Sequence, residues 1–244
     1  MQAGRKRLPL SAWLKWTLFG PRFGPRAAAV EGFDSRYHLG TIPAGYHFAY
    51  FKATEGVGWE QTSPGWRNQA DFADKQSIPW GLYHFFLDSA DPKEQARWFW
   101  NVIKSRPGQL PPVLDFEVSS TNARVRDCMA ELALVSGKRP MIYTSPHYWN
   151  SYIGNQAWIL NYDRWVAHWT SAAAPSLPTG WPDWQVWQYT GSVTVPGFTA
   201  SIDRDRAQDA WLKQFTAPPP PAPPAEVRIE VRVPASVKVD VLPL

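Results

Sequence analysis

The chain has 244 residues, a formal net charge of +4 and an apolar content of 44%. This composition predicts one folded domain with tails, and no apolar run reaches the roughly 18 residues that a membrane-spanning helix requires. The basic residues are dispersed apart from an amino-terminal cluster, which argues against a nucleic-acid-binding surface. The five His and single Cys lack metal-ligand spacing, so we expect no metal or other cofactor, and Cys128 is expected to be a buried, inert thiol.

Residues 1–29 form an extension before the predicted domain. A basic cluster at residues 5–7 precedes an apolar stretch at 8–19, as in a signal peptide, with a possible cleavage region at 27–29. Against this, Lys15 interrupts the apolar stretch, and its apolar residues also follow helical spacing. A short amphipathic docking helix is therefore the alternative.

Eight short runs rich in aromatic and β-branched residues predict strands in residues 30–216. They are residues 30–34, 48–56, 80–85, 111–117, 139–144, 165–169, 184–190 and 200–203. Helical patterns separate several of these strands. Three helices are predicted: one from an N-cap at Ser63 to about Gln76, one from an N-cap at Asp91 to about Ser105, and one over residues 122–136 that ends before Gly137. This alternation predicts an α/β fold with a parallel sheet, and eight strands predict a compact TIM-like barrel that lacks some helices.

Acidic residues fall at the ends of several predicted strands. Asp34 ends the first strand, Asp115 and Glu117 end the fourth, and Asp203 ends the last. Side chains at i and i+2 of a strand point to one face, about 6.6 Å apart. Such a pair suits cleavage of a glycosidic bond, in which one acid protonates the leaving oxygen and another stabilises the cationic sugar. The competing interpretation is a set of solvated or ion-paired strand ends.

Seven segments between Gly32 and about Phe215 form a recognisable set. They are Gly-Phe-Asp at 32–34, Phe-Ala-Tyr-Phe-Lys-Ala-Thr-Glu-Gly at 48–56, Gly-Leu-Tyr-His-Phe at 81–85, Pro-Pro-Val-Leu-Asp-Phe-Glu at 111–117, Lys-Arg-Pro-Met-Ile-Tyr-Thr-Ser-Pro at 138–146, Trp-Gln-Tyr-Thr at 187–190 and Ile-Asp at 202–203. Each segment is a weak signal alone, but their common order makes the set specific. On these segments the chain resembles the glycoside hydrolase family 25 lysozymes, the Chalaropsis-type muramidases.

This resemblance implies an irregular (β/α)5(β)3 barrel that hydrolyses β-1,4 bonds between N-acetylmuramic acid and N-acetylglucosamine in bacterial peptidoglycan. Glu117 then corresponds to the general acid, with a pKa raised by burial and by neighbouring acids. Asp115, Asp34 and Asp203 would line the same pocket and stabilise the oxocarbenium-like transition state. Covalent attack by an Asp and attack by the substrate's acetamido group both stay open. The protein would act outside the cell, on the cell wall.

Aromatic residues near the predicted strand ends are candidate sugar contacts, because flat rings pack against sugar faces. They are Tyr83, Tyr143, Trp169, Trp187 and Tyr189. Family members carry tyrosines at the positions of Tyr83 and Tyr143. The competing expectation is that most of the rings belong to the core. Lys52 and Glu55 are expected to form a supporting ion pair beneath the site, and His84 and His168 to be hydrogen-bonded rather than bases.

Two features depart from the family pattern. Arg36 follows the first acid by two residues, where it could pair with an acid and lower its pKa or contact peptide carboxylates of the substrate. Residues 39–47 are too few for the helix that family members have there. The loss of that helix would expose an apolar flank of the barrel. We expect another segment, with residues 8–19 as the candidate, or a partner to cover this flank.

The carboxyl-terminal residues differ in composition from the domain. Residues 217–225 are a proline-rich linker, and residues 226–244 alternate apolar and polar side chains as a β-strand does. One such strand cannot bury its apolar face alone, so it would join a sheet of another copy or another protein, or stay disordered. Two functions remain open: a muramidase, in one form carried by a phage particle, or a weak or inactive barrel that serves a larger assembly such as a phage tail.

Overall fold

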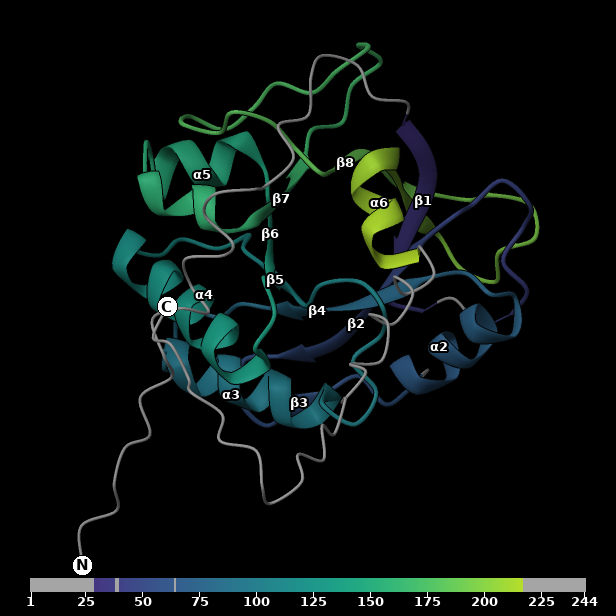
Figure 1. Cartoon of the computed structure of the whole chain (residues 1–244), viewed down its shortest axis with the longest axis horizontal. Helices are drawn as coiled ribbons and strands as arrows, with labels where there is room; N and C mark the ends of the chain where they lie inside the picture. The colour runs from purple at the N-terminus through teal and green to yellow at the C-terminus, as the bar shows by residue number, and fades with distance from the viewer. Residues whose placement is uncertain (1–28, 38–39, 64, 217–244) are drawn as a thin grey trace, which may run out of the picture.

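The computed structural model describes residues 29–37, 40–63 and 65–216 (Figure 1). The expectations for the amino-terminal extension, for cover by residues 8–19, and for the linker and the β-strand tail lie outside these residues. Within the described part of the chain, every helix is too short or too polar to cross a lipid bilayer.

Eight strands close into a barrel, as predicted (Figure 1). They are β1 (Ala29–Ser35), β2 (Ala49–Glu55), β4 (Trp80–Phe85), β5 (Val113–Asp115), β6 (Met141–Thr144), β7 (Asp163–Ala167), β8 (Val186–Val193) and β9 (Ile202–Gln208). Neighbours from β1 to β8 pair in parallel. The last strand, β9, is antiparallel to both β8 and β1 and closes the barrel. The short β3 (Trp59–Glu60), which the sequence did not predict, extends the sheet antiparallel to β2.

Helices surround the barrel (Figure 1). They are α2 (Trp66–Lys75), α3 (Pro92–Ile103), α4 (Asn122–Ser136), α5 (Pro146–Tyr152) and the short 3-10 helix η1 (Ala157–Asn161). The Asp91 carboxylate caps α3 by accepting from two backbone amides at 2.9 Å, and Gly137 ends α4 with a φ of 62°. The predicted cap at Ser63 is wrong: the N-cap of α2 is Gly65, which forms an isolated antiparallel bridge with Thr62.

The first connection differs from the implied (β/α)5(β)3 pattern, because the described residues between β1 and β2 contain no helix. The flank is nevertheless covered. The backbone of Ile42 is held by the Gln76 amide at 2.7 and 2.8 Å. Tyr46 and Phe198 pack edge-on against Phe33, with ring centroids 5.6 and 4.8 Å away. Short loops thus replace the missing helix on this flank.

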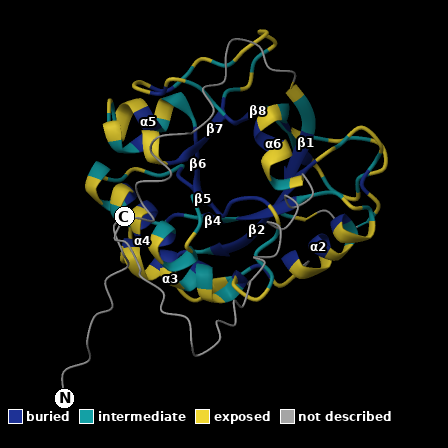
Figure 2. Cartoon of the chain, in the orientation of Figure 1, coloured by how far each residue is buried: buried dark blue, intermediate teal, exposed yellow. Residues whose placement is uncertain are grey.

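Two apolar cores result, one between strands and helices and one inside the barrel, so the strands are buried on both faces (Figure 2). Large rings fill the interior, and two glycines make room for them. A Cβ at Gly32 would lie 2.2 Å from the Phe48 ring, and one at Gly81 would lie 2.2 Å from the Tyr50 ring. Both positions therefore require glycine because of space rather than backbone conformation.

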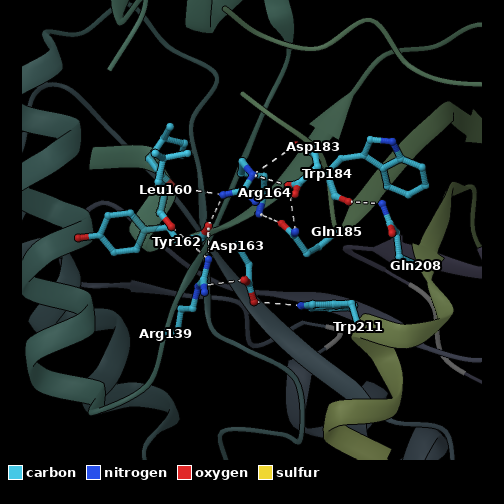
Figure 3. A network of polar contacts seen from close by, with 11 residues as sticks. Arg139, Leu160, Tyr162, Asp163, Arg164, Asp183, Trp184, Gln185, Gln208 and Trp211 are labelled. Atoms are coloured by element: carbon cyan, nitrogen blue, oxygen red, sulfur yellow. Dashed lines mark hydrogen bonds and ion pairs between the residues drawn. The ribbon is translucent and has the colours of Figure 1, made fainter. Parts of the chain in front are cut away.

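The end of the barrel where the parallel strands begin is closed by α6 (Asp209–Thr216) (Figure 3). The Trp211 indole donates to Asp163, the first residue of β7, at 3.0 Å, and Arg139 pairs with the same carboxylate at 3.0 Å. Next to it, the buried Arg164 pairs with Asp183 and donates to the carbonyl of Tyr162 at 2.8 Å. This network seals one end, so the interior can open only at the other.

Candidate active site

A pocket opens at the end of the barrel where the parallel strands finish. Seven of the eight strands contribute to it, and Glu117 follows β5 by two residues. The lining residues are Asp34, Tyr83, Asp115, Glu117, Tyr143, Trp165, Gln188 and Asp203. The structure thus brings together the four acids that the sequence singled out, although they are separated by up to 169 positions in the chain.

Asp203 reaches the pocket in a way that the sequence did not predict. The expected strand ended at Asp203, whereas β9 begins at Ile202 and continues to Gln208. Because β9 is antiparallel to its neighbours, its beginning lies beside their ends, and Asp203 pairs with Asp34 in the register of β1 and β9. Its carboxylate also accepts from the backbone amide of Ser192.

Gln188 connects the acids to the aromatic residues of the pocket. Its Nε2 donates to Asp34 Oδ2 at 2.8 Å and to Asp203 Oδ2 at 3.2 Å. Its Oε1 accepts from the Tyr143 hydroxyl and from Trp169 Nε1, both at 2.9 Å. Gln188 was not among the predicted site residues, although an amide inside an aromatic-rich strand was a usable signal.

Burial raises the pKa of all four acids, and repulsion from neighbouring acids adds to the rise for Asp34, Asp115 and Glu117. Burial is the largest cause in each case. Repulsion from Asp203 further raises the pKa of Asp34 and of Glu117, and repulsion from Glu117 raises that of Asp115. The charge of Lys52 lowers the pKa of Asp115 and Glu117 without reversing the shift. The cluster therefore retains protons at a pH where exposed carboxyls have lost them.

Lys52 and Glu55 form the expected ion pair, with Nζ and Oε2 2.6 Å apart. The ammonium group of Lys52 also lies over the rings of Phe85 at 4.7 Å and Trp59 at 5.2 Å. Lys52 is buried, whereas the Glu55 side chain is partly exposed. Lys52 thus places a positive charge near the acids, although neither Lys52 nor Glu55 lines the pocket.

The candidate sugar contacts separate into two groups. Tyr83 and Tyr143 line the pocket, and Trp169 is 64% exposed while its indole donates to Gln188. Trp187 and Tyr189 lie elsewhere, because side chains alternate along β8 and Gln188 between them points inward.

The Trp187 side chain is buried in the outer core, and the Tyr189 hydroxyl donates to Glu31 at 2.5 Å. The structure therefore places both rings with the outer core of the barrel and not in the pocket lining.

The two histidines are hydrogen-bonded, as expected. Burial lowers the pKa of His84 to about 3, so its ring is neutral, and Nδ1 lies 2.7 Å from the Thr54 hydroxyl. His168 Nδ1 accepts from the backbone amide of Ser176 at 2.9 Å. Burial also raises the pKa of the Cys128 thiol, which keeps it protonated and unreactive.

Arg36 lies close to the pocket, and its charge lowers the pKa of the pocket residue Tyr83 against the dominant effect of burial. Its Nε donates to Gln61 Oε1 at 3.2 Å, and its guanidinium lies 4.9 and 5.4 Å from the ring centres of Tyr37 and Trp59. The ion pairs between described residues do not include Arg36. Within this part of the chain, the alternative in which Arg36 pairs with an acid is not observed.

A closed barrel with a cluster of proton-retaining carboxyls at the ends of its strands has the architecture of a glycoside hydrolase. The family model described as glycosyl hydrolases family 25 matches residues 37–198. The chain is 31% identical over 208 residues to lysozyme M1 of Streptomyces globisporus, covering 73% of this chain and 68% of that protein. It is 30% identical over 198 residues to an N,O-diacetylmuramidase of Chalaropsis sp., covering 69% and 91%. The chain belongs to glycosyl hydrolase family 25.

Solved structures agree with this assignment. The bacterial lysozyme from Streptomyces coelicolor superposes with a TM-score of 0.64 at 27% identity, over 78% of this chain and 99% of that one. A family 25 lysozyme from Aspergillus fumigatus gives the same TM-score at 21% identity, over 78% and 100%, which supports the fold alone.

Proposed function

We propose that the chain is a muramidase that hydrolyses the β-1,4 bond between N-acetylmuramic acid and N-acetylglucosamine in bacterial peptidoglycan. The observation that carries the proposal is the meeting of Asp34, Asp115, Glu117 and Asp203 in one pocket. The names of two relatives, lysozyme M1 and N,O-diacetylmuramidase, support the choice of substrate. The site of action is then the bacterial wall, outside the cell.

Glu117 is the general acid in this proposal. Burial and the charge of Asp203 raise its pKa, so the carboxyl carries a proton that it can transfer to the glycosidic oxygen as the bond to the anomeric carbon breaks. The ionised members of the cluster stabilise the positive charge that develops on the sugar. An Asp carboxylate or the substrate's acetamido oxygen then attacks the anomeric carbon, and Glu117 accepts a proton from the water that completes hydrolysis.

Tyr83, Tyr143 and Trp169 are the proposed sugar contacts. The two tyrosines line the pocket, and the exposed Trp169 ring is fixed by its hydrogen bond to Gln188. An aromatic face held in one orientation loses little entropy when a sugar ring packs on it.

A second candidate function belongs to a different class of protein. In it, the chain is a catalytically weak or inactive barrel that binds the cell wall or forms part of a larger assembly. The proline-rich linker and the alternating segment at 226–244 support participation in an assembly such as a phage particle. The four retained acids favour a catalytically active component of such an assembly over an inactive one. Size-exclusion chromatography with light scattering of the full chain and of a chain ending at residue 216 tests this part: equal monomers would contradict it.

The experiment that tests the muramidase is release of reducing ends from purified peptidoglycan by the wild type and by Glu117→Gln. We expect muramic-acid reducing ends from the wild type and a loss of about 10²- to 10⁴-fold in the variant, because the amide cannot donate an acidic proton. Glu94→Gln, an exposed glutamate on α3, is the matched control and should behave as wild type.

Two results would reject the assignment. Release of glucosamine reducing ends would identify a different glycosidase, and an absence of release from several wall types across pH 4–8 would favour the second function. Full activity of Glu117→Gln would leave the enzyme class intact and move the acid role to another carboxyl.

A further inference from the structure

A fifth carboxyl lies inside the barrel beneath the four pocket acids. Asp205 follows Asp203 by two residues on β9, so both side chains point to the interior. Its side chain is fully buried, and its Oδ1 accepts from Trp165 Nε1 at 2.9 Å. On β1 its register partner is Gly32, which has no side chain. No established element of the proposed mechanism uses this residue.

The carboxyl of Asp205 lies close to that of Asp34. Besides the larger effect of burial, their side-chain interaction lowers the pKa of Asp34 and raises that of Asp205. Within the described residues, Oδ2 of Asp205 is buried and has no hydrogen-bond partner. Two ionised carboxylates in this position would repel each other without solvent to screen them. One proton between the two carboxyls removes the repulsion and gives Oδ2 a partner.

We propose that Asp205 is a positioning residue that stays protonated and donates its proton in a hydrogen bond to Asp34, which keeps Asp34 ionised and oriented toward the substrate. No bond other than this hydrogen bond forms, and the proton stays on Asp205 through the reaction. Asp34 is the better anion of the two, because it lines the open pocket and accepts from Gln188 Nε2 at 2.8 Å, whereas Asp205 is fully buried.

The other titratable groups around Asp205 support this distribution of charge. Burial raises the pKa of Asp205 most, followed by repulsion from Asp34 and from Asp203. The hydrogen bond from Trp165 on β7 acts against this rise without reversing it. On β2, burial raises the pKa of Tyr50, so its phenol is neutral and adds no charge beside Asp205.

A protonated carboxyl has one acceptor oxygen and one donor group, and an asparagine amide offers the same pair. Asp205→Asn can therefore accept from Trp165 and donate to Asp34, whereas Asp205→Leu can do neither. We expect Asp205→Asn to retain kcat within about threefold of wild type and Asp205→Leu to lose at least about tenfold, with KM changed less than kcat in both. These activity measurements rest on the proposed function.

A second measurement is independent of activity. The infrared carbonyl stretch of a protonated carboxyl at pH 7 should be weaker in Asp205→Asn than in the wild type, and the melting temperature of Asp205→Asn should fall less between pH 6.5 and pH 8. Asp209→Asn, a change at a partly exposed carboxyl on α6, is the control and should leave the infrared band unchanged.

Three outcomes would overturn the proposal: an unchanged infrared band in Asp205→Asn, equal losses of kcat in the Asn and Leu variants, or the same pH dependence of the melting temperature in Asp205→Asn and wild type. If the chain releases no reducing ends from any wall, the infrared and thermal measurements still decide whether Asp205 carries the proton.

Discussion

At the scale of single residues, Gln188 explains how two acids of different strands can lie close together. Its amide nitrogen donates to both Asp34 and Asp203, so the repulsion between their oxygens is offset by a shared donor. The amide oxygen is held in turn by Tyr143 and Trp169. All polar atoms of the side chain thus have partners, which fixes the orientation of the amide.

Arg36 provides a prediction about the substrate at the same scale. Its guanidinium lies over two exposed rings near the pocket, which suits it to contact carboxylates of the peptides that peptidoglycan carries. We expect Arg36→Gln to lower kcat/KM on peptide-bearing peptidoglycan about threefold to fivefold at low salt, since an exposed ion pair contributes up to about 1 kcal/mol. Kinetics on the same glycan after removal of its peptides should show no difference from wild type.

The matched control for Arg36 is Arg126→Gln, at an exposed arginine on α4. This variant should be unchanged on both polymers. An equal loss by Arg36→Gln on peptide-bearing and peptide-free glycan would instead indicate that Arg36 supports the pocket itself.

At the scale of elements, the interior of the barrel is limited by space. A Cβ at Gly81 would lie 2.2 Å from the Tyr50 ring and 3.0 Å from Leu110 Cβ. We expect Gly81→Ala to lower the free energy of unfolding by about 1–3 kcal/mol, because neither neighbour can move without disturbing the packed interior. Urea denaturation measures this loss. In a Tyr50→Leu background the same substitution should cost less, and equal costs in both backgrounds would show that the Tyr50 ring is not the obstacle.

Elements also show what the sequence could and could not reveal. The eight barrel strands and the helices α3 and α4 were predictable because their apolar runs and caps are local signals, such as Asp91 before α3 and Gly137 after α4. The direction of β9 was not predictable, because it depends on pairing with β1 and β8 across the closed barrel. Asp34 and Asp203 were recognised as site acids because an acid near a predicted strand end is a local signal. Gln188 and Asp205 were missed because their roles arise only from long-range contacts.

At the scale of the whole molecule, the buried acids make stability depend on pH. Their folded-state pKa values are raised above the unfolded values of about 4. The folded state therefore binds more protons than the unfolded state above about pH 4, and this contribution to stability is lost as the pH rises through the folded-state pKa values. His84 acts in the opposite direction: its pKa of about 3 reduces stability as the pH falls below about 6.5.

The acids thus dominate above about pH 6.5, and we expect the free energy of unfolding to fall between pH 6.5 and pH 8. Asp34→Asn removes one charge from the cluster, so it should be more stable than wild type at pH 8 by about 1–2 kcal/mol while losing activity. Chemical denaturation at both pH values checks this. A wild-type stability that rises over this range, or a destabilised Asp34→Asn, would contradict the electrostatic account.

The antiparallel closure by β9 has a further consequence for the use of this barrel as a module. Ala29 at the start of β1 pairs with Gln208 at the end of β9, and α6 follows there, so the described chain enters and leaves the barrel at the sealed end. Cargo fused before residue 29 or after residue 216 would attach behind the pocket. Attachment to a surface directly at residue 29 or at residue 216 would therefore turn the pocket away from that surface.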